Sequence, residues 1–466
     1  MTTVTLPGSA RATTEVQRLA QFVQGVNAGA LAESTRTAVK VRILDALGCA
    51  IGALGAPPLR AMRELVEHLG GTPTATLIGG GSTSPDRAAL YNGALVRYLD
   101  FNDAFLAKHE TCHPSDNLGV VLAAAEHVRA GGERLIAALA IAYAVQCRLS
   151  EVAPVRDKGF DHTTQGAYAA VAGAAYALGL DWQRSAHAIA ISGTANNALR
   201  VTRTGRLSNW KGLAYPYTGM NGMFAALLAE HGITGPLEVF EGNKGFMDAI
   251  AGHFTIAWTP DALRSVERTS IKRFNAEIHS QSAVEGILEL RQEHGLKGED
   301  VESIELATFD VAHKIIGGGE EGEKHTVTTK EEADHSLPYM LAVALLDGEL
   351  TPRQYLPERI VRDDVQRLLR RVRIAPDPAL SAKFPALMPA HLTITLSGGR
   401  TLSIAKDDYA GYATRPMRWE QAVEKFNILA APHADEAIRG QIIGVVQDLE
   451  RRRVGELTAL LRNPKE

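Results

Sequence analysis

Cysteine is scarce in this chain. Only three cysteines occur among 466 residues, at Cys49, Cys112 and Cys147, and no two of them have CxxC spacing. A disulfide framework, a structural zinc site or an iron–sulfur cluster needs paired or clustered cysteines. We therefore expect free thiols, and none of these three kinds of site.

Long runs of one charge are also missing. The 49 basic and 53 acidic residues are interspersed and leave a formal net charge of -4. A nucleic-acid-binding domain usually carries a basic stripe or face. We expect no nucleic-acid partner, and an anionic ligand would need positive charge gathered locally.

The sequence offers no clear membrane or export segment. Residues 1–16 contain no apolar stretch after a basic one, which a secretory signal requires. The uncharged run 163–180 consists mostly of Ala, Gly, Thr and Tyr rather than Leu and Ile. We expect this run to form a buried helix, and the protein to be cytoplasmic with no membrane partner.

Two kinds of hydrophobic pattern divide the chain. Apolar residues recur at helical spacing over 34–54 and from 118 to 232, whereas 301–311 alternates like a strand. Segments 391–396 and 401–404, joined by Ser-Gly-Gly-Arg, predict a hairpin. The predicted fold class is mainly α: a large all-helical domain over 1–267, with 411–466 packing back on it, and a smaller α+β lid domain over 268–410 with an antiparallel sheet.

A polar block, DFNDAFLAKHETCHPSDN over 100–117, lies between two predicted helices. It gathers four carboxylates and two histidines on a connection that rigid helices can hold, which suits acid/base groups. Within it, His109 to His113 matches the zinc pattern HExxH. Pro114 disfavours helical geometry at His113, so we expect no zinc site and an exposed loop position for His109.

Further polar clusters interrupt the later helices. Packing does not require them, although each taken alone is also what a solvated loop would show. They are Lys158–Thr164, Asn196–Asn197, Arg200–Arg206 and Ser208–Lys211.

Several longer motifs carry a resemblance that covers nearly the whole chain. They are DFND at Asp100, HPSDN at His113, KGFDH at Lys158, LRVTRTGRLSNWKGLAYP at Leu199, GPLEVFEGNKGF at Gly235, NAEIHSQSAVEG at Asn275 and EADHSLPYM at Glu332. With these motifs in this order, the sequence resembles the MmgE/PrpD family. That family contains 2-methylcitrate dehydratases that do not depend on an iron–sulfur cluster, together with cis-aconitate decarboxylase and iminodisuccinate epimerase.

The resemblance implies a site between the two domains, a homodimer formed through the helical domain, and no cofactor. The catalytic residues that it carries over by motif are Asp100, His113, His162, Lys211 and Lys272. The decarboxylase branch has a histidine where this chain has Glu277, which favours a dehydratase. The roles of Glu277 and His279 as substrate-binding residues stay open.

Chemistry asks for the same residue types. Removing water from a 2-hydroxy tricarboxylate requires a base, an acid for the leaving oxygen, and cations for the charge of an enediolate-like state. The aspartate and the two histidines can supply the base and the acid, and the two lysines can hold carboxylates. Arg203 or Arg273 can clamp a carboxylate with two hydrogen bonds. Which group is base and which is acid stays open, and each residue also has a purely structural alternative.

The predicted function is therefore a hydro-lyase that converts the small-molecule polycarboxylate 2-methylcitrate to 2-methyl-cis-aconitate without a metal, with citrate as a second candidate substrate. The alternatives are a cis-aconitate decarboxylase, an epimerase of a related polycarboxylate, and a non-catalytic binding protein that keeps the same cleft.

Overall fold

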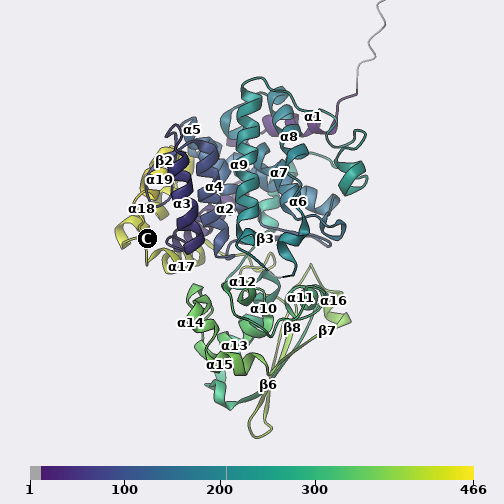
Figure 1. Cartoon of the computed structure of the whole chain (residues 1–466), viewed down its shortest axis with the longest axis vertical. Coiled ribbons are helices and arrows are strands. Elements are labelled where there is room, and N and C mark those ends of the chain that lie inside the picture. Colours follow the sequence, from purple (N-terminus) through teal and green to yellow (C-terminus); the bar gives the residue numbers. More distant parts are fainter. Residues whose placement is uncertain (1–11, 206) are drawn as a thin grey trace, which may run out of the picture.

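The computed structural model describes residues 12–205 and 207–466 and has two parts along its long axis (Figure 1). The larger part, at the top of the figure, is built mainly of helices. The smaller part below it combines helices with a sheet. This architecture confirms the predicted fold class, a mainly α protein with a smaller α+β part.

The larger part takes helices from both ends of the chain. Its C-terminal helix α17 packs on α2, where a Cβ atom on Gly48 would lie 3.2 Å from the Cα atom of Phe426. The helices are α1 (Glu15–Gln24), α2 (Glu33–Gly52), α3 (Pro57–Leu69), α4 (Pro85–Tyr98), α5 (Leu118–His127), α6 (Gly132–Val152), α7 (Thr163–Leu178), α8 (Trp182–Ala195), α9 (Trp210–Glu230), α17 (Trp419–Ala430), α18 (Glu436–Gln447) and α19 (Val454–Leu461).

Small residues allow these helices to approach closely. A Cβ atom on Gly119 of α5 would lie 2.5 Å from the amide nitrogen of Gly93 in α4, so this crossing requires glycine. Helix α7 is buried along its whole length, as predicted for the uncharged run. One helix, α6, is long and apolar enough to cross a membrane, but 83% of its most apolar window is buried inside the protein.

The smaller part contains a four-stranded sheet in the order β7–β6–β8–β9. The predicted hairpin is present as the antiparallel pair β8–β9, and β6 pairs with β8 in the same sense. The pair β6–β7 is parallel, so the sheet is mixed rather than purely antiparallel. The elements are α10 (Gln281–His294), β6 (Val301–Thr308), α11 (Asp310–Ile316), α12 (Lys330–Ala333), α13 (Leu337–Asp347), α14 (Pro357–Ile360), α15 (Asp363–Leu369), β7 (Val372–Pro376), α16 (Pro378–Ser381), β8 (Ala390–Leu396) and β9 (Thr401–Lys406).

Short strands also occur beside the helices. The larger part was predicted to be all helical, and these strands are the exception. Strand β1 (Ala75–Thr76) pairs with β2 (Ser82–Thr83). Strand β3 (Asp103–Leu106) pairs with β4 (Thr111–Cys112) on one side and with β5 (Ser270–Ile271) on the other. The second of these sheets ties the polar block to a segment about 170 residues later.

Each part has its own hydrophobic core. The larger core takes residues from Val16 to Ile271 and from Ala422 to Leu461, and the smaller one takes residues from Ala276 to Leu402. The chain therefore passes between the parts twice. The two crossings lie side by side: the Ile271 amide donates to the Gly411 carbonyl at 2.8 Å, and the Ala413 amide donates to Ser270 Oγ at 3.0 Å.

Candidate active site

The pairing of β3 with β5 brings the polar block next to the residues before α10. Asp103 lies opposite Ile271, so Lys272 follows directly beside the start of the block. Lys425 of α17 holds both segments from beneath, because its ammonium group donates to the carbonyls of Phe101 at 2.6 Å and Lys272 at 2.8 Å. Three distant stretches of sequence thus fix the position of one site.

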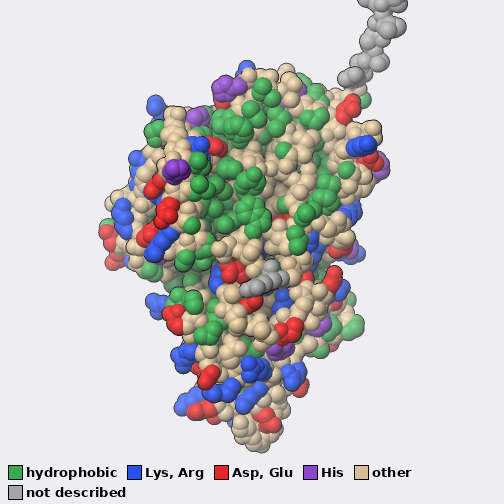
Figure 2. Space-filling model, in the orientation of Figure 1, with side chains coloured by type: hydrophobic (Ala, Val, Ile, Leu, Met, Phe, Trp, Pro, Cys, Tyr) green, Lys and Arg blue, Asp and Glu red, His purple; other side chains and the backbone are tan. Residues whose placement is uncertain are grey.

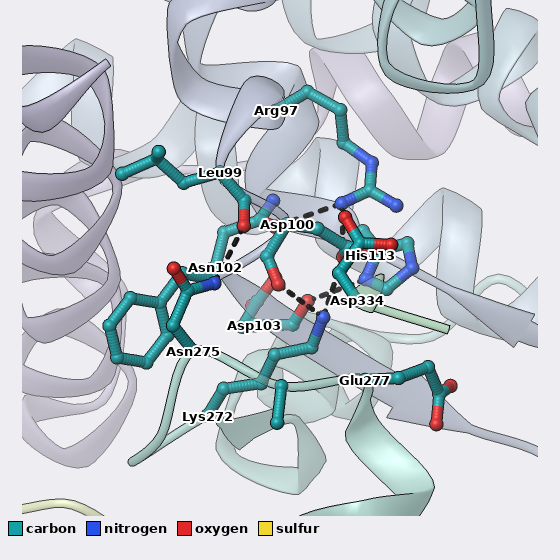
Figure 3. Close-up of polar contacts among 12 residues, drawn as sticks. Arg97, Leu99, Asp100, Asn102, Asp103, His113, Lys272, Asn275, Glu277 and Asp334 are labelled. Carbon is teal, nitrogen blue, oxygen red and sulfur yellow. Dashed lines mark hydrogen bonds and ion pairs between the residues drawn. The ribbon is translucent and has the colours of Figure 1, made fainter. Parts of the chain in front are cut away.

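Asp100 is the anion at the centre of this site (Figure 3). Arg97 and Lys272 approach it from opposite sides, and each donates to Oδ1 at 2.6 Å, while Lys211 Nζ lies 3.4 Å from Oδ2. Burial alone would raise the pKa of Asp100, but these three cations hold it well below its ordinary value. Its backbone has φ 51°, in the left-handed region, so the surroundings impose a costly conformation on this residue.

Asp334, between α12 and α13, supplies a second buried anion. Lys211 Nζ donates to its Oδ1 at 2.7 Å, and Lys330 Nζ donates to its Oδ2 at 2.8 Å. His335 Nδ1 lies 2.8 Å from Lys211 Nζ. Burial would raise the pKa of Asp334, but Lys211 and Lys330 lower it below its ordinary value. Lys211 therefore bridges Asp100 of the larger part and Asp334 of the smaller part.

His113 and His162 lie together, with ring centroids 5.4 Å apart and an edge-to-face geometry. Nδ1 of His113 is 2.8 Å from the Asp103 carbonyl. A carbonyl oxygen only accepts, so Nδ1 must carry the proton and Nε2 must carry the lone pair. Burial, together with the positive charges of Arg97 and Lys272, lowers the pKa of His113 well below its ordinary value. His113 is therefore neutral at pH 7.

His162 stands before α7 and faces Asp161 at a distance of 3.4 Å between Nδ1 and Oδ1. Burial lowers the pKa of His162 to about 3; Asp161 opposes this shift and Arg203 adds to it. Its Nε2 atom is buried and has no hydrogen-bond partner among the residues that the structure describes. A buried polar atom left in this state is costly unless a ligand satisfies it.

Arg203 is buried beside these histidines. Its Nε donates to Asp161 Oδ2 at 2.8 Å, and its Nη1 donates to the Lys211 carbonyl at 2.9 Å. Most of its donors are therefore already used within the protein. This arrangement makes Arg203 a support for the Asp161–His162 pair and for the start of α9.

Glu277 and His279 form a pair on the other side of the site. Oε1 of Glu277 lies 2.8 Å from His279 Nδ1, and the His279 ring contacts Phe309 and Phe384. Burial acts to raise the pKa of Glu277, but the combined effect of His279, His335 and Lys272 lowers that pKa to about 2. In Figure 3 the Glu277 carboxylate points away from the Asp100 cluster.

Arg273 is the predicted site residue that the structure does not bring to this cluster. Its side chain is 50% exposed and pairs with Glu285 at 3.1 Å. It lines a separate groove that also contains Phe274 and Lys425. The predicted carboxylate clamp therefore does not come from Arg273.

Comparison with known proteins identifies the family of this chain. The model described as the MmgE/PrpD N-terminal domain matches residues 17–259, and the one described as the MmgE/PrpD C-terminal domain matches residues 274–451. The chain belongs to the MmgE/PrpD family.

Relatives of this MmgE/PrpD chain include named lyases. It is 29% identical to a 2-methylcitrate dehydratase of Cupriavidus necator over 400 residues, which covers 79% of each chain. It is 28% identical to that of Salmonella typhimurium, covering 88% of this chain and 89% of the relative. It is 24% identical to the cis-aconitate decarboxylase of Mus musculus, covering 96% of this chain and 93% of the relative. These matches support an enzyme of this family, and more of the cited relatives are dehydratases than decarboxylases.

The MmgE/PrpD site surrounds an inner cavity of about 50 Å³, next to an outer cavity of about 580 Å³. The predicted residues that line the inner cavity are Asp100, His113, His162, Arg203, Lys272, Glu277 and His279. Lys211 lies behind Asp100, beside a much smaller cavity. Six residues border both the inner and the outer cavity: Glu110, Thr111, Arg156, Arg200, Ile315 and Glu321.

Within residues 12–205 and 207–466 of this MmgE/PrpD chain, one group has the donor types for a metal ion. Asp100, Asp334 and His335 place ligand atoms within 4.8 Å of one another. Lys211 Nζ lies 3.4 Å from Asp100 Oδ2, 2.7 Å from Asp334 Oδ1 and 2.8 Å from His335 Nδ1. The ammonium group of this lysine therefore occupies the central position. The HExxH pattern does not have the helical geometry that this zinc motif uses, because strand β4 runs through it and His109 is exposed.

Sequence reasoning missed several members of this MmgE/PrpD site. The EADHSLPYM motif contains both Asp334 and His335, so this motif could have revealed them. Arg97 lies within a helical pattern that looks like any surface arginine, and Glu321 lies in an acidic, glycine-rich stretch. No local pattern marks either of these two residues.

Proposed function

We propose that this protein is a hydro-lyase that removes water from 2-methylcitrate to give 2-methyl-cis-aconitate, with citrate as a second candidate substrate. One observation carries the proposal. Two neutral histidines face the inner cavity together with Lys272 and Arg97. This set offers proton acceptors and cations at one place, as an elimination beside a carboxylate requires.

The histidine pair is the proposed proton acceptor. Asp100 suits this role less well, because a carboxylate held by three cations is a weak base. In the free protein, burial and nearby arginines disfavour a charged His162. A bound polycarboxylate would offset the arginine charges, so His162 becomes more basic when the substrate is present. Asp161 then stabilises the imidazolium, as the carboxylate does in a His–Asp pair.

Lys272 is the proposed acid for the departing hydroxyl group. Its ammonium group is buried, borders the inner cavity and donates to Asp100 at 2.6 Å. The substrate loses a proton from carbon to a histidine, and the hydroxyl group leaves as water with a proton from Lys272. Arg97 stabilises the charge that develops on the adjacent carboxylate. Transfer of the proton from the histidine back to the lysine completes the cycle.

The Mus musculus relative makes decarboxylation of cis-aconitate the second candidate. The decarboxylase branch has a histidine at the position of Glu277. The glutamate in this chain therefore favours dehydration over decarboxylation. An epimerase would use the same proton removal without loss of water. Substrate comparison separates these chemistries, because only dehydration creates a conjugated double bond from a saturated tricarboxylate.

A second copy of this chain is the proposed partner, and α9 offers the surface for it. Trp210, Tyr217 and Phe224 recur every seven residues on this helix and are 46%, 45% and 54% exposed. Figure 2 shows hydrophobic side chains gathering over this part of the molecule, whereas charged side chains dominate the smaller part. Exposed aromatic rows of this kind are typical of protein interfaces.

Ultraviolet absorbance of aconitate-type double bonds tests the proposed reaction with 2-methylcitrate, citrate and cis-aconitate. Wild type should form the double bond from 2-methylcitrate. His113→Gln and His162→Gln should each lower kcat by ~10²-fold or more. His109→Gln, which changes an exposed histidine of the same polar block, is the matched control and should keep wild-type kcat. Consumption of cis-aconitate, with no dehydration of 2-methylcitrate or of citrate, would contradict the proposal.

A further inference from the structure

Two arginines of the larger part converge on one carboxylate of the smaller part. Nη2 of Arg156 and Nη2 of Arg200 lie 2.9 and 2.7 Å from the same oxygen, Oε1 of Glu321. The side chains of the three residues are only 20%, 17% and 9% exposed. All three border both the inner and the outer cavity, so this contact forms part of the wall between them.

The carboxylate comes from a loop that is built to move more easily than the arginines. Glu321 lies in the sequence Gly-Gly-Gly-Glu-Glu-Gly over 317–322, and Gly318 and Gly322 have φ angles of 100° and 97°. Arg156 and Arg200 begin short 3-10 helices, and their backbone amides donate to Glu110 Oε2 at 3.1 Å and to the Gly159 carbonyl at 2.9 Å. Glycine lowers the barrier to a change of backbone conformation. Moving Glu321 therefore requires less rearrangement than moving either arginine.

Charge and volume both indicate that a ligand would take this place. The inner cavity is lined by five Arg or Lys residues and four Asp or Glu residues, so removing Glu321 raises the excess of positive charge from one to two. Its volume of about 50 Å³ holds only about three to five water molecules, which is too little for a tricarboxylate. Withdrawal of Glu321 joins this space to the outer cavity of about 580 Å³.

We infer that Arg156 and Arg200 form a subsite for one carboxylate of a polycarboxylate ligand, and that Glu321 occupies this subsite until the ligand displaces it. The inference rests on the proposed function only in taking a polycarboxylate as the ligand. Glu321 acts as an internal competitor, so the apparent affinity equals the intrinsic affinity multiplied by the fraction of molecules in which the subsite is free. A ligand with too few carboxylates has no group for this subsite. It therefore cannot replace the contacts that Glu321 makes with the two arginines, and it binds more weakly.

Binding of propane-1,2,3-tricarboxylate, measured by titration calorimetry, tests the inference. This compound has no hydroxyl group to lose, so its binding does not depend on catalysis. Glu321→Gln keeps the size of the side chain and removes its charge, and it should bind the tricarboxylate about tenfold more tightly than wild type. Glu302→Gln is the control, because it removes the same charge from an exposed position on β6 that borders neither cavity, and it should leave the affinity within about twofold of wild type.

A double-mutant cycle with Arg200→Gln separates competition from a general electrostatic effect. In wild type this change removes a ligand contact and a competitor contact together, so the loss of affinity is small. In the Glu321→Gln background only the ligand contact remains, and the loss should be at least about tenfold larger. Glutarate, which lacks one carboxylate, should gain less than the tricarboxylate from Glu321→Gln.

Equal affinity of wild type and Glu321→Gln for the tricarboxylate would overturn the inference, as would equal effects of Arg200→Gln in both backgrounds. Failure of wild type and Glu321→Gln to bind at millimolar concentration would overturn it too. Failure of the proposed function is a separate result. In that case the tricarboxylate binds as expected, but neither 2-methylcitrate nor citrate is dehydrated.

Discussion

Replacing His162 by glutamine should make the stability of the protein less sensitive to acid. In the folded protein burial keeps the pKa of His162 at about 3, whereas an unfolded histidine titrates near 6.5. The folded value lies below the unfolded value, so protons bind more readily to the unfolded chain. His162 therefore costs no stability above pH 6.5, and it destabilises the fold progressively as the pH falls from 6.5 to 3.

The size of the effect follows from this difference. A pH of 5 lies about 1.5 units below the pKa of the unfolded imidazole, and each unit corresponds to about 1.4 kcal/mol. His162 should therefore remove about 2 kcal/mol from the free energy of unfolding between pH 8 and pH 5. Urea unfolding followed by circular dichroism at both pH values measures this loss. In His162→Gln the loss should be smaller by that amount.

His109→Gln is the control for this experiment, because it removes an exposed histidine from the same chain. It should lose as much stability as wild type when the pH falls from 8 to 5. If His162→Gln also loses as much as wild type, His162 is not held neutral in the folded protein. The assignment of this residue as a neutral proton acceptor would then be wrong.

Three further predictions concern the support of the site, metals and assembly. Lys425→Met should lower the free energy of unfolding by about 3–5 kcal/mol, because Asp45 and the carbonyls of Phe101 and Lys272 all lose their buried partner; urea unfolding should also show that adding Asp45→Asn recovers part of the loss. Dehydratase activity should survive chelation and dialysis, because an ammonium group occupies the centre of the metal-like triad; loss with EDTA and recovery with zinc or iron would contradict this. Light scattering should give the mass of a dimer at micromolar concentration, and a stable particle of 50.0 kDa would show a monomer instead.

Local sequence pattern predicted the elements of the fold better than their partners. Helical spacing identified the buried helices, and the Ser-Gly-Gly-Arg turn identified the β8–β9 hairpin. Alternation over β6 indicated a strand but said nothing of its neighbours, so the parallel pairing with β7 was not predictable. The strands β3 and β5 have four and two residues, which is too short for a periodic pattern.

The same limit applies to the site. Asp100, His113 and Lys272, which the motifs singled out, line one cavity, but the motifs could not decide which way neighbouring side chains point. Successive residues of an extended segment face opposite sides. After β5, Lys272 faces inward with 1% of its side chain exposed, whereas Arg273 faces outward with 50% exposed. Only the pairing of β3 with β5 settles which of the two adjacent cations reaches the site.

The two chain crossings between the parts, joined by the Ile271–Gly411 hydrogen bond, attach the smaller part along a single line. For chain connections alone, rotation about that line is the relative motion of the parts that would change the backbone least. The contact between Lys272 and Asp100 begins one residue from β5 and therefore moves little during such a rotation. Contacts farther from the line separate most. Such a rotation would widen the entrance for a ligand and keep the Lys272–Asp100 contact.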